Sequence, residues 1–257
     1  MSDNKPQTNR TVATRRSVKQ KRAQRERRQG IIILVAGIVI VLVILGFAVY
    51  PQIKTATTPI GTIVQITPVA RPQASGTAAG NPNAKVRIDV FEDFQCPVCR
   101  QFTATIEPQL MQNEVASGQV YYVFHNFPFI DRGTWTSAQR ESHQAANAAM
   151  CAAAQGRFWD YHDILFANWT GENVGDFNDN RLVAYAQTLK LDMNIFNTCF
   201  KANTYKAQID ADLAEGNSMN VTGTPSIFVN NKEVTPGSVP TYAQIQQAIA
   251  QAVATAK

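Results

Sequence analysis

Alternating apolar and polar residues predict where the strands lie. Residues 86–90 read VRIDV, and a period of two is typical of a strand that buries one face. The apolar run VYYVFH at residues 120–125 predicts a second strand. Near the C-terminus, residues 226–229 and 232–234 predict a two-strand hairpin, because the two asparagines between them favour a turn.

Apolar residues spaced three and four positions apart predict helices. One such face, in the stretch QGRFWDYHDILF at residues 155–166, consists of Phe158, Tyr161, His162, Leu165 and Phe166. Residues 136–139 have the form of a capping box, which predicts that an alanine-rich helix begins there and ends at about residue 155. Other helices are predicted over residues 101–115, 181–190, 193–201 and 205–215 and from residue 242 onward.

The order of these elements indicates an α/β fold. A strand, a helix and a strand are followed by about 80 helical residues, then by a two-strand hairpin and a final helix. We therefore predict one domain over residues 84–257, with a helical insertion at about residues 136–218.

A single uninterrupted apolar run lies near the N-terminus. Residues 31–50 contain no charged side chain, and a helix of this length matches the roughly 30 Å hydrocarbon core of a bilayer. We predict a transmembrane helix. The alternative is a cleaved signal peptide, whose apolar region would be shorter, at about 7 to 15 residues, and would be followed by a small-residue cleavage site.

Charge is distributed unevenly along the chain. The net charge is +5, but residues 1–30 hold ten Lys or Arg against Asp3 and Glu26, and the remaining 14 basic and 17 acidic residues give −3. A basic segment before a membrane span is typical of a cytoplasmic tail, so everything after Tyr50 should be extracytoplasmic, in the periplasm or at the cell surface. A mildly acidic body argues against nucleic acid as a partner.

Residues 51–83 are rich in Pro, Thr, Ala and Gly and show no helical period. We interpret them as a linker, with the folded part beginning near Ala84. The alternative within this stretch is that residues 60–66 form an additional strand.

The main candidate for chemistry is the pair Cys96 and Cys99, in the sequence CPVC. A C-x-x-C pair is either half of a zinc site or a redox dithiol. The two other cysteines, Cys151 and Cys199, are far away along the chain, so no close second ligand pair is present and we predict no metal. No cofactor beyond a redox-active disulfide is expected.

The dithiol lies between a predicted strand and a predicted helix. The N-terminus of a helix favours an anion, so a thiolate at Cys96 should be stabilised and its pKa lowered. Pro97 suits the first helical turn because it has no N–H group to leave unpaired. Cys96 should therefore be the exposed sulfur, and Cys99, one turn further, the buried resolving thiol.

Three segments resemble the extracytoplasmic DsbA-like thioredoxin-fold oxidoreductases. They are FEDFQCPVC at residues 91–99, QGRFWDYHDILF at 155–166 and VTGTPSIFVN at 221–230. The resemblance covers about residues 83–254. It implies a thioredoxin-like fold with an inserted helical domain, preceded here by a single transmembrane helix.

The resemblance implies roles for two further pairs of residues. Thr224 and Pro225 would form a cis-proline loop that packs beside the dithiol and presents backbone to a substrate, although a plain turn is the alternative. Related proteins commonly join the helical insertion with a structural disulfide, which here would link Cys151 and Cys199. Bridging is also the more frequent state of a leftover cysteine pair in an oxidising compartment, with two buried free thiols as the alternative.

The sequence departs from the family pattern at two positions that affect redox tuning. Val98 stands where strongly oxidising members have a histidine, and Val90 stands where many thioredoxin-fold enzymes carry a buried acid. Glu92 and Asp93 lie closer to the cysteines and are candidates for assisting proton transfer. Acids in an exposed loop are the alternative interpretation of both.

The sequence thus predicts a membrane-anchored thiol:disulfide oxidoreductase that forms disulfides in exported proteins with free thiols. Its re-oxidation would need an electron acceptor, which we expect to be a quinone-linked membrane partner. A reductase or isomerase of the same fold is the first alternative. A non-catalytic module that binds a partner protein is the second.

Overall fold

The computed structural model describes residues 34–44, 60–69, 71–131, 135–136 and 139–255, and the chain divides into two units, Met1–Thr58 and Pro59–Lys257. In the first unit, residues 34–44 are helical. Within the described residues, no helix has both the length and the apolar character needed to cross a membrane. The predicted span over residues 31–50 extends past the described helix at both ends, so it stays a prediction.

The second unit is built on a five-stranded sheet with the order β1-β3-β2-β4-β5. The strands are β1 (Ala78–Gly80), β2 (Val86–Glu92), β3 (Val120–Asn126), β4 (Ser226–Val229) and β5 (Lys232–Glu233). The central strand β2 runs parallel to β3 and antiparallel to β4. These strands coincide with the predicted ones to within two residues at each end, except for β1, which lies in the predicted linker.

The central strand is buried more completely than its alternating sequence predicts. Asp89 lies on the face expected to be polar, yet it is buried and accepts hydrogen bonds from Arg87 and pairs with His125 at 2.7 Å. The pattern predicted one solvated face. Elements pack on both sides of β2, and the Asp89 carboxylate is satisfied by Arg87 and His125 rather than by water.

The helix after the dithiol is broken into three parts. The segments α2 (Pro97–Thr105), α3 (Glu107–Leu110) and η1 (Met111–Val115) replace the predicted single helix. Pro108 has no N–H group to donate, so a helical hydrogen bond is lost at the junction. The final helix α9 (Tyr242–Thr255) follows the hairpin as predicted.

Between β3 and β4 the described residues form five helices: α4 (Glu141–Ala153), α5 (Phe158–Ala167), α6 (Asp179–Thr188), α7 (Met193–Lys201) and α8 (Lys206–Ser218). Cys151 of α4 and Cys199 of α7 form a disulfide, with their Cα atoms 5.8 Å apart. Helix α4 begins after Arg140, which makes no side-chain capping bond, so the predicted capping box at residues 136–139 is not its start.

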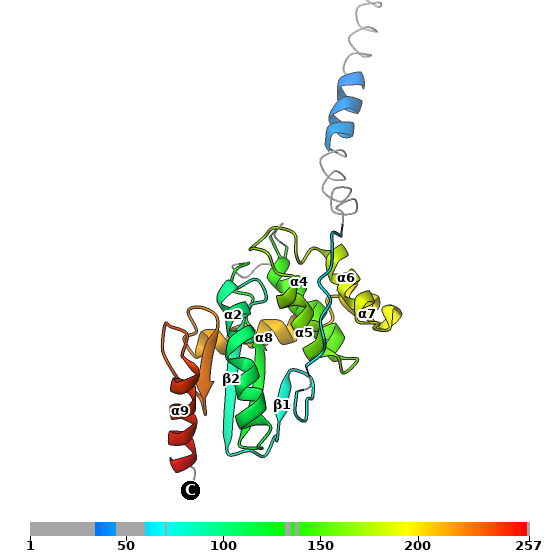
Figure 1. Cartoon of the computed structure of the whole chain (residues 1–257). Helices are drawn as coiled ribbons and strands as arrows, with labels where there is room; N and C mark the ends of the chain where they lie inside the picture. Colours follow the sequence, from blue (N-terminus) through cyan, green and yellow to red (C-terminus); the bar gives the residue numbers. More distant parts are fainter. Residues whose placement is uncertain (1–33, 45–59, 70, 132–134, 137–138, 256–257) are drawn as a thin grey trace, which may run out of the picture. The chain divides into compact units, whose positions relative to one another are not determined.

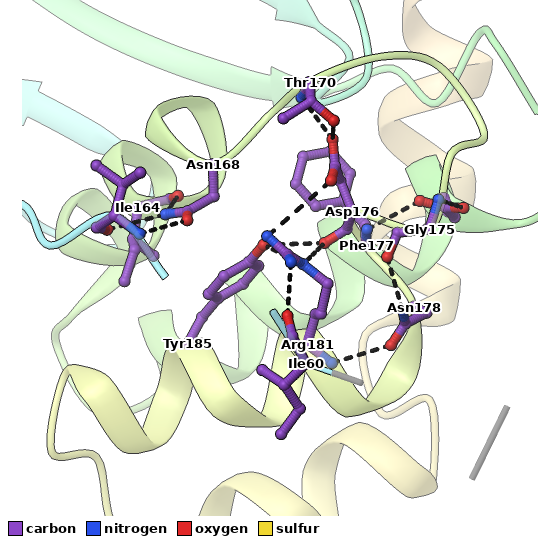
Figure 2. Close-up of polar contacts among 12 residues, drawn as sticks. Ile60, Ile164, Asn168, Thr170, Gly175, Asp176, Phe177, Asn178, Arg181 and Tyr185 are labelled. Atoms are coloured by element: carbon purple, nitrogen blue, oxygen red, sulfur yellow. Dashed lines mark hydrogen bonds and ion pairs between the residues drawn. The ribbon is translucent and has the colours of Figure 1, made fainter. Parts of the chain in front are cut away.

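The fold begins earlier than the predicted boundary at Ala84. Strand β1 pairs with β3, and before it the leading segment, which we define as residues 60–69 and 71–77, runs past α6 and α5 to the sheet (Figure 1). Figure 2 shows Arg181 donating to the Ile60 carbonyl, and the Asn168 side chain bonds to both backbone groups of Val64. Residues 60–66 therefore form no strand; they are held by side chains of the helical region.

Candidate active site

Cys96 caps the N-terminus of α2, directly after the loop that follows β2. Its sulfur accepts a hydrogen bond from the Cys99 N–H at 3.4 Å, and Pro97 occupies the first turn. Hydrogen bonding from the Cys99 thiol, opposed by burial and reinforced by hydrogen bonding from the Thr224 side chain, lowers the pKa of Cys96 to about 6. Backbone N–H groups of Cys99 and Val98 act in the same direction. A thiolate at neutral pH follows from this geometry.

Cys99 is chemically the opposite of Cys96. Burial raises its pKa well above the ordinary value, and its hydrogen bond to Cys96 and the charge of Glu92 add to the effect. In the reduced protein at neutral pH, Cys96 is therefore the thiolate and Cys99 the thiol. Cys96 is less exposed than we expected, because only 6% of its surface is accessible.

The cover over Cys96 comes from a distant loop. The Thr224-Pro225 peptide bond is cis, and the carbonyl oxygen of Thr224 accepts a hydrogen bond from the Cys96 thiol at 3.2 Å. These residues lie 128 positions apart in the sequence. The fold thus brings the loop that the resemblance identified directly against the sulfur.

The two residues between the cysteines face outward. The Val98 side chain is 40% exposed and contributes only its backbone N–H to the Cys96 sulfur. Phe129, in the loop after β3, is 47% exposed. No histidine contributes to the low pKa of Cys96, which depends on hydrogen bonds to its sulfur.

Asp93 is buried, which overturns its interpretation as an exposed loop acid. Burial raises the pKa of its carboxyl group to about 7, although hydrogen bonds from the Ile130 and Gln95 N–H groups oppose the rise. These bonds connect the loop before Cys96 to the loop after β3. Asp93 therefore positions the dithiol loop.

Glu92 is also buried, at the end of β2. Burial, followed by the charges of Glu107 and Cys96, raises its pKa well above the ordinary value. Val90, the position at which related enzymes would carry an acid, packs in the hydrophobic core. In this chain Glu92, two residues after Val90 on the same strand, supplies the buried carboxyl group close to Cys99.

Sequence reasoning missed Gln95, the residue just before Cys96. Its side chain donates to Asp131 and Ser142, and its carbonyl oxygen accepts from the Trp169 indole at 2.7 Å. Asn173 donates its backbone N–H to the Gln95 side chain at 2.6 Å. Gln95 thereby connects the dithiol loop to the helical region. Its only signal in the sequence was its position beside the first cysteine.

Comparisons with known proteins identify the family and the fold. The model of a protein family described as Thioredoxin matches residues 73–251. A probable disulfide bond formation protein D from Bacillus cereus is 26% identical over 159 residues, which cover 61% of this chain and 71% of that protein.

Two solved structures share the fold. Oxidised BdbD from Bacillus subtilis has a TM-score of 0.60 at 22% identity, covering 74% of this chain and 100% of that chain. Reduced DsbA from Mycobacterium tuberculosis has a TM-score of 0.51 at 26% identity, covering 71% of this chain and 96% of that chain. The matched region starts before Ala84, in agreement with the early start of the fold.

Proposed function

The chain belongs to the thioredoxin family, and from that membership we propose that it catalyses disulfide formation in exported proteins through Cys96 and Cys99. The observation that carries this proposal is the difference between the two thiols. Cys96 has a pKa of about 6 and adjoins the cis Thr224-Pro225 bond, whereas Cys99 is fully buried with a raised pKa.

The reaction that suits this geometry is thiol–disulfide exchange. A substrate thiolate attacks the Cys96 sulfur of the oxidised enzyme, the Cys96–Cys99 bond breaks, and Cys99 leaves with the electron pair. A second substrate thiolate then attacks the substrate sulfur of the mixed disulfide and releases Cys96 as a thiolate. The substrate loses two electrons, which reduce the enzyme dithiol.

The leaving sulfur requires a proton, because Cys99 is a thiol in the reduced enzyme. Glu92 is the buried carboxyl group whose charge raises the pKa of Cys99, and burial raises its own pKa well above the ordinary value, which favours its protonated form. We assign this proton transfer to Glu92. Replacing it by glutamine should slow the exchange at Cys99 while leaving the pH dependence of Cys96 alkylation in place.

The direction of electron flow follows from which redox state the site stabilises. A low pKa at Cys96 stabilises the reduced enzyme and makes its disulfide oxidising. The test is the reduction potential, measured by equilibration with glutathione. We expect a reduction potential well above that of thioredoxin, which is about −270 mV. A value close to thioredoxin would instead support the reductase alternative.

A trapping experiment distinguishes the proposed enzyme from a non-catalytic module that only binds a partner protein. In the Cys99→Ser variant the Cys96 thiolate can still attack a disulfide of an exported protein and release one substrate thiol. No Cys99 thiol is then present to displace the bound substrate, so the mixed disulfide through Cys96 should accumulate. If no such species forms and Cys96→Ser retains full function in the cell, the chain acts as a binding module.

We further propose an uncleaved N-terminal anchor with the catalytic unit outside the cytoplasm and a quinone-linked membrane partner. Support comes from the charge-free run over residues 31–50 and the ten basic residues before it. A membrane-impermeant thiol reagent should label reduced Cys96 in intact cells. Labelling that requires cell lysis would contradict this topology.

A further inference from the structure

Behind the dithiol lies a buried cluster of three side chains from three elements: Glu92 of β2, Glu107 of α3 and His162 of α5. One ligand atom from each lies within 4.8 Å of the other two. All three side chains are buried, and both Glu92 oxygens, Glu107 Oε2 and His162 Nε2 make no hydrogen bond in the described part of the chain. Four potential ligand atoms thus converge without a partner.

His162 lies between two acidic side chains. Its Nδ1 lies 2.9 Å from Asp163 Oδ1, where it donates a hydrogen bond because an ionised carboxylate can only accept. Its Nε2 faces Glu107 Oε2 at 3.6 Å and makes no hydrogen bond in the described part of the chain, so this nitrogen is the one open to a ligand.

Glu92 is the carboxyl group of the cluster that has no basic partner. Arg71 contacts Glu107 and Asp163, each at 2.7 Å, and no basic side chain pairs with Glu92 in the described part of the chain. The rings of Phe94, Phe124, Phe158, Trp159 and Phe166 surround His162. An ionised carboxylate without a partner in such an apolar place costs several kcal/mol. Glu92 therefore holds either a proton or a cation, and a bound cation displaces the proton that Glu92 otherwise gives to Cys99.

We propose that Glu92, Glu107 and His162 bind a divalent first-row transition metal ion of the zinc class. Ligand atoms at about 2.1 Å from a tetrahedral ion lie about 3.4 Å apart, close to the observed 3.6 Å between His162 and Glu107. The imidazole nitrogen favours zinc over calcium or magnesium, which prefer oxygen ligands.

The residues around the cluster form the outer shell that such sites use. A metal-binding histidine almost always donates its other N–H to a carboxylate or carbonyl group, as His162 does to Asp163. Arg71 holds the second oxygen of Glu107. Arg71 and Asp163 also line a groove of about 980 Å³ beside α2.

A second buried histidine provides a matched control. His143 is equally buried, contacts Asp131 through Nδ1 at 2.9 Å and has an unpartnered Nε2. It belongs to no group of three potential ligands in the part of the chain that the structure describes. The two histidines therefore differ in whether carboxylates face the free nitrogen.

The test is zinc binding to the full-length chain without a histidine tag, with both cysteine pairs oxidised so that no thiol competes. Calorimetry and metal analysis should give one Zn²⁺ per chain. Glu107→Gln and His162→Asn should each weaken binding more than about tenfold, the lower end of the loss seen even for outer-shell changes, while His143→Asn retains it. Equal loss in His143→Asn, or no binding by the oxidised wild-type chain, would overturn the proposal.

X-ray absorption at the zinc edge of the loaded wild-type chain needs no variant, so it remains decisive if a substitution prevents folding. We expect oxygen and nitrogen ligands that include a single imidazole. Sulfur ligands, or a zinc ion without imidazole, would place the metal elsewhere and overturn the assignment.

Discussion

The two cysteine pairs of this chain share a residue type, and three of the four cysteines are buried, yet their surroundings give the pairs opposite chemistry. Cys151 and Cys199 lie in the last turns of two helices, and their disulfide links α4 to α7. Cys96 and Cys99 lie within one helical turn, at a helix N-terminus and against the Thr224 carbonyl. Only the second pair is arranged so that one sulfur is stabilised as a thiolate.

The difference shows that burial alone does not decide the reactivity of a cysteine. Cys96 is 6% accessible, but hydrogen bonds hold its pKa low, whereas Cys99 lacks that stabilisation and its pKa rises. A disulfide between two separate helices instead acts on the unfolded chain, by restricting the loop it closes. The two pairs should therefore respond differently to the same substitutions.

The largest expected effect is on activity. Cys96→Ser should reduce the oxidation of a dithiol peptide to the uncatalysed rate, because the sulfur that forms the mixed disulfide is gone. The double variant Cys151→Ala/Cys199→Ala should retain the rate per folded molecule. A fluorescence assay of peptide oxidation measures both. Residual catalysis in Cys96→Ser would contradict the assignment of the reactive sulfur.

The second effect is on stability and concerns the other pair. Cys151 and Cys199 are separated by 48 positions, and a disulfide closing a loop of that length contributes about 4 kcal/mol in the loop-entropy model. Urea unfolding of the Cys151→Ala/Cys199→Ala variant should show a loss of this order in the free energy of unfolding. A loss below about 1 kcal/mol would mean that the bridge constrains the unfolded chain little.

The third effect is a pH dependence confined to the dithiol. Alkylation of reduced Cys96 should be half-maximal near pH 6 and fall about tenfold per pH unit below it, because only the thiolate reacts. The folded pKa lies below the ordinary value of 9.0. The thiolate therefore stabilises the reduced fold fully above pH 9, and this contribution is lost as the pH falls towards 6.

Two variants sharpen that profile. Cys99→Ala removes the largest cause of the low pKa, so the alkylation midpoint should move to higher pH. Cys151→Ala/Cys199→Ala should leave the midpoint unchanged. A shift in the second variant would show that the two pairs are coupled.

The smallest effect concerns the exposed Val98. Val98→His would place an imidazole beside the thiolate and should lower the pKa of Cys96 by about one unit, which corresponds to about 1.4 kcal/mol. The same energy raises the reduction potential by about 30 mV. Val98→Asn is the uncharged control, and an equal shift in both variants would exclude a charge effect.

Much of the local structure could be predicted from the sequence. Helix α7 and strand β4 have the predicted bounds, 193–201 and 226–229, because their apolar periods coincide with the faces that they bury. The predicted capping box at residues 136–139 was not the start of α4, because contacts with a distant loop hold the first turn of that helix. The Glu141 carboxylate accepts from the N–H groups of Gly175 and Phe177 in a distant loop.

The leading segment shows a different limit. Its composition is typical of a linker, yet Ile63 and Ile66 pack against the core and Asn168 binds the backbone of Val64. Nothing in the segment itself reports these partners, since they belong to the helical region about 100 positions later. A segment without a period of its own can still be ordered by the surface that it covers.

The sequence by itself determined the chemistry: a strand, then CPVC opening a helix, which places a low-pKa thiol before a buried one. Only the tertiary structure decided what surrounds that dithiol. Thr224 covers Cys96 from 128 positions away, and Glu92 meets Glu107 and His162 behind Cys99. The physical reason is that a helix terminus acts through bonds within a few residues, whereas burial and charge pairing depend on segments that meet only in the folded chain.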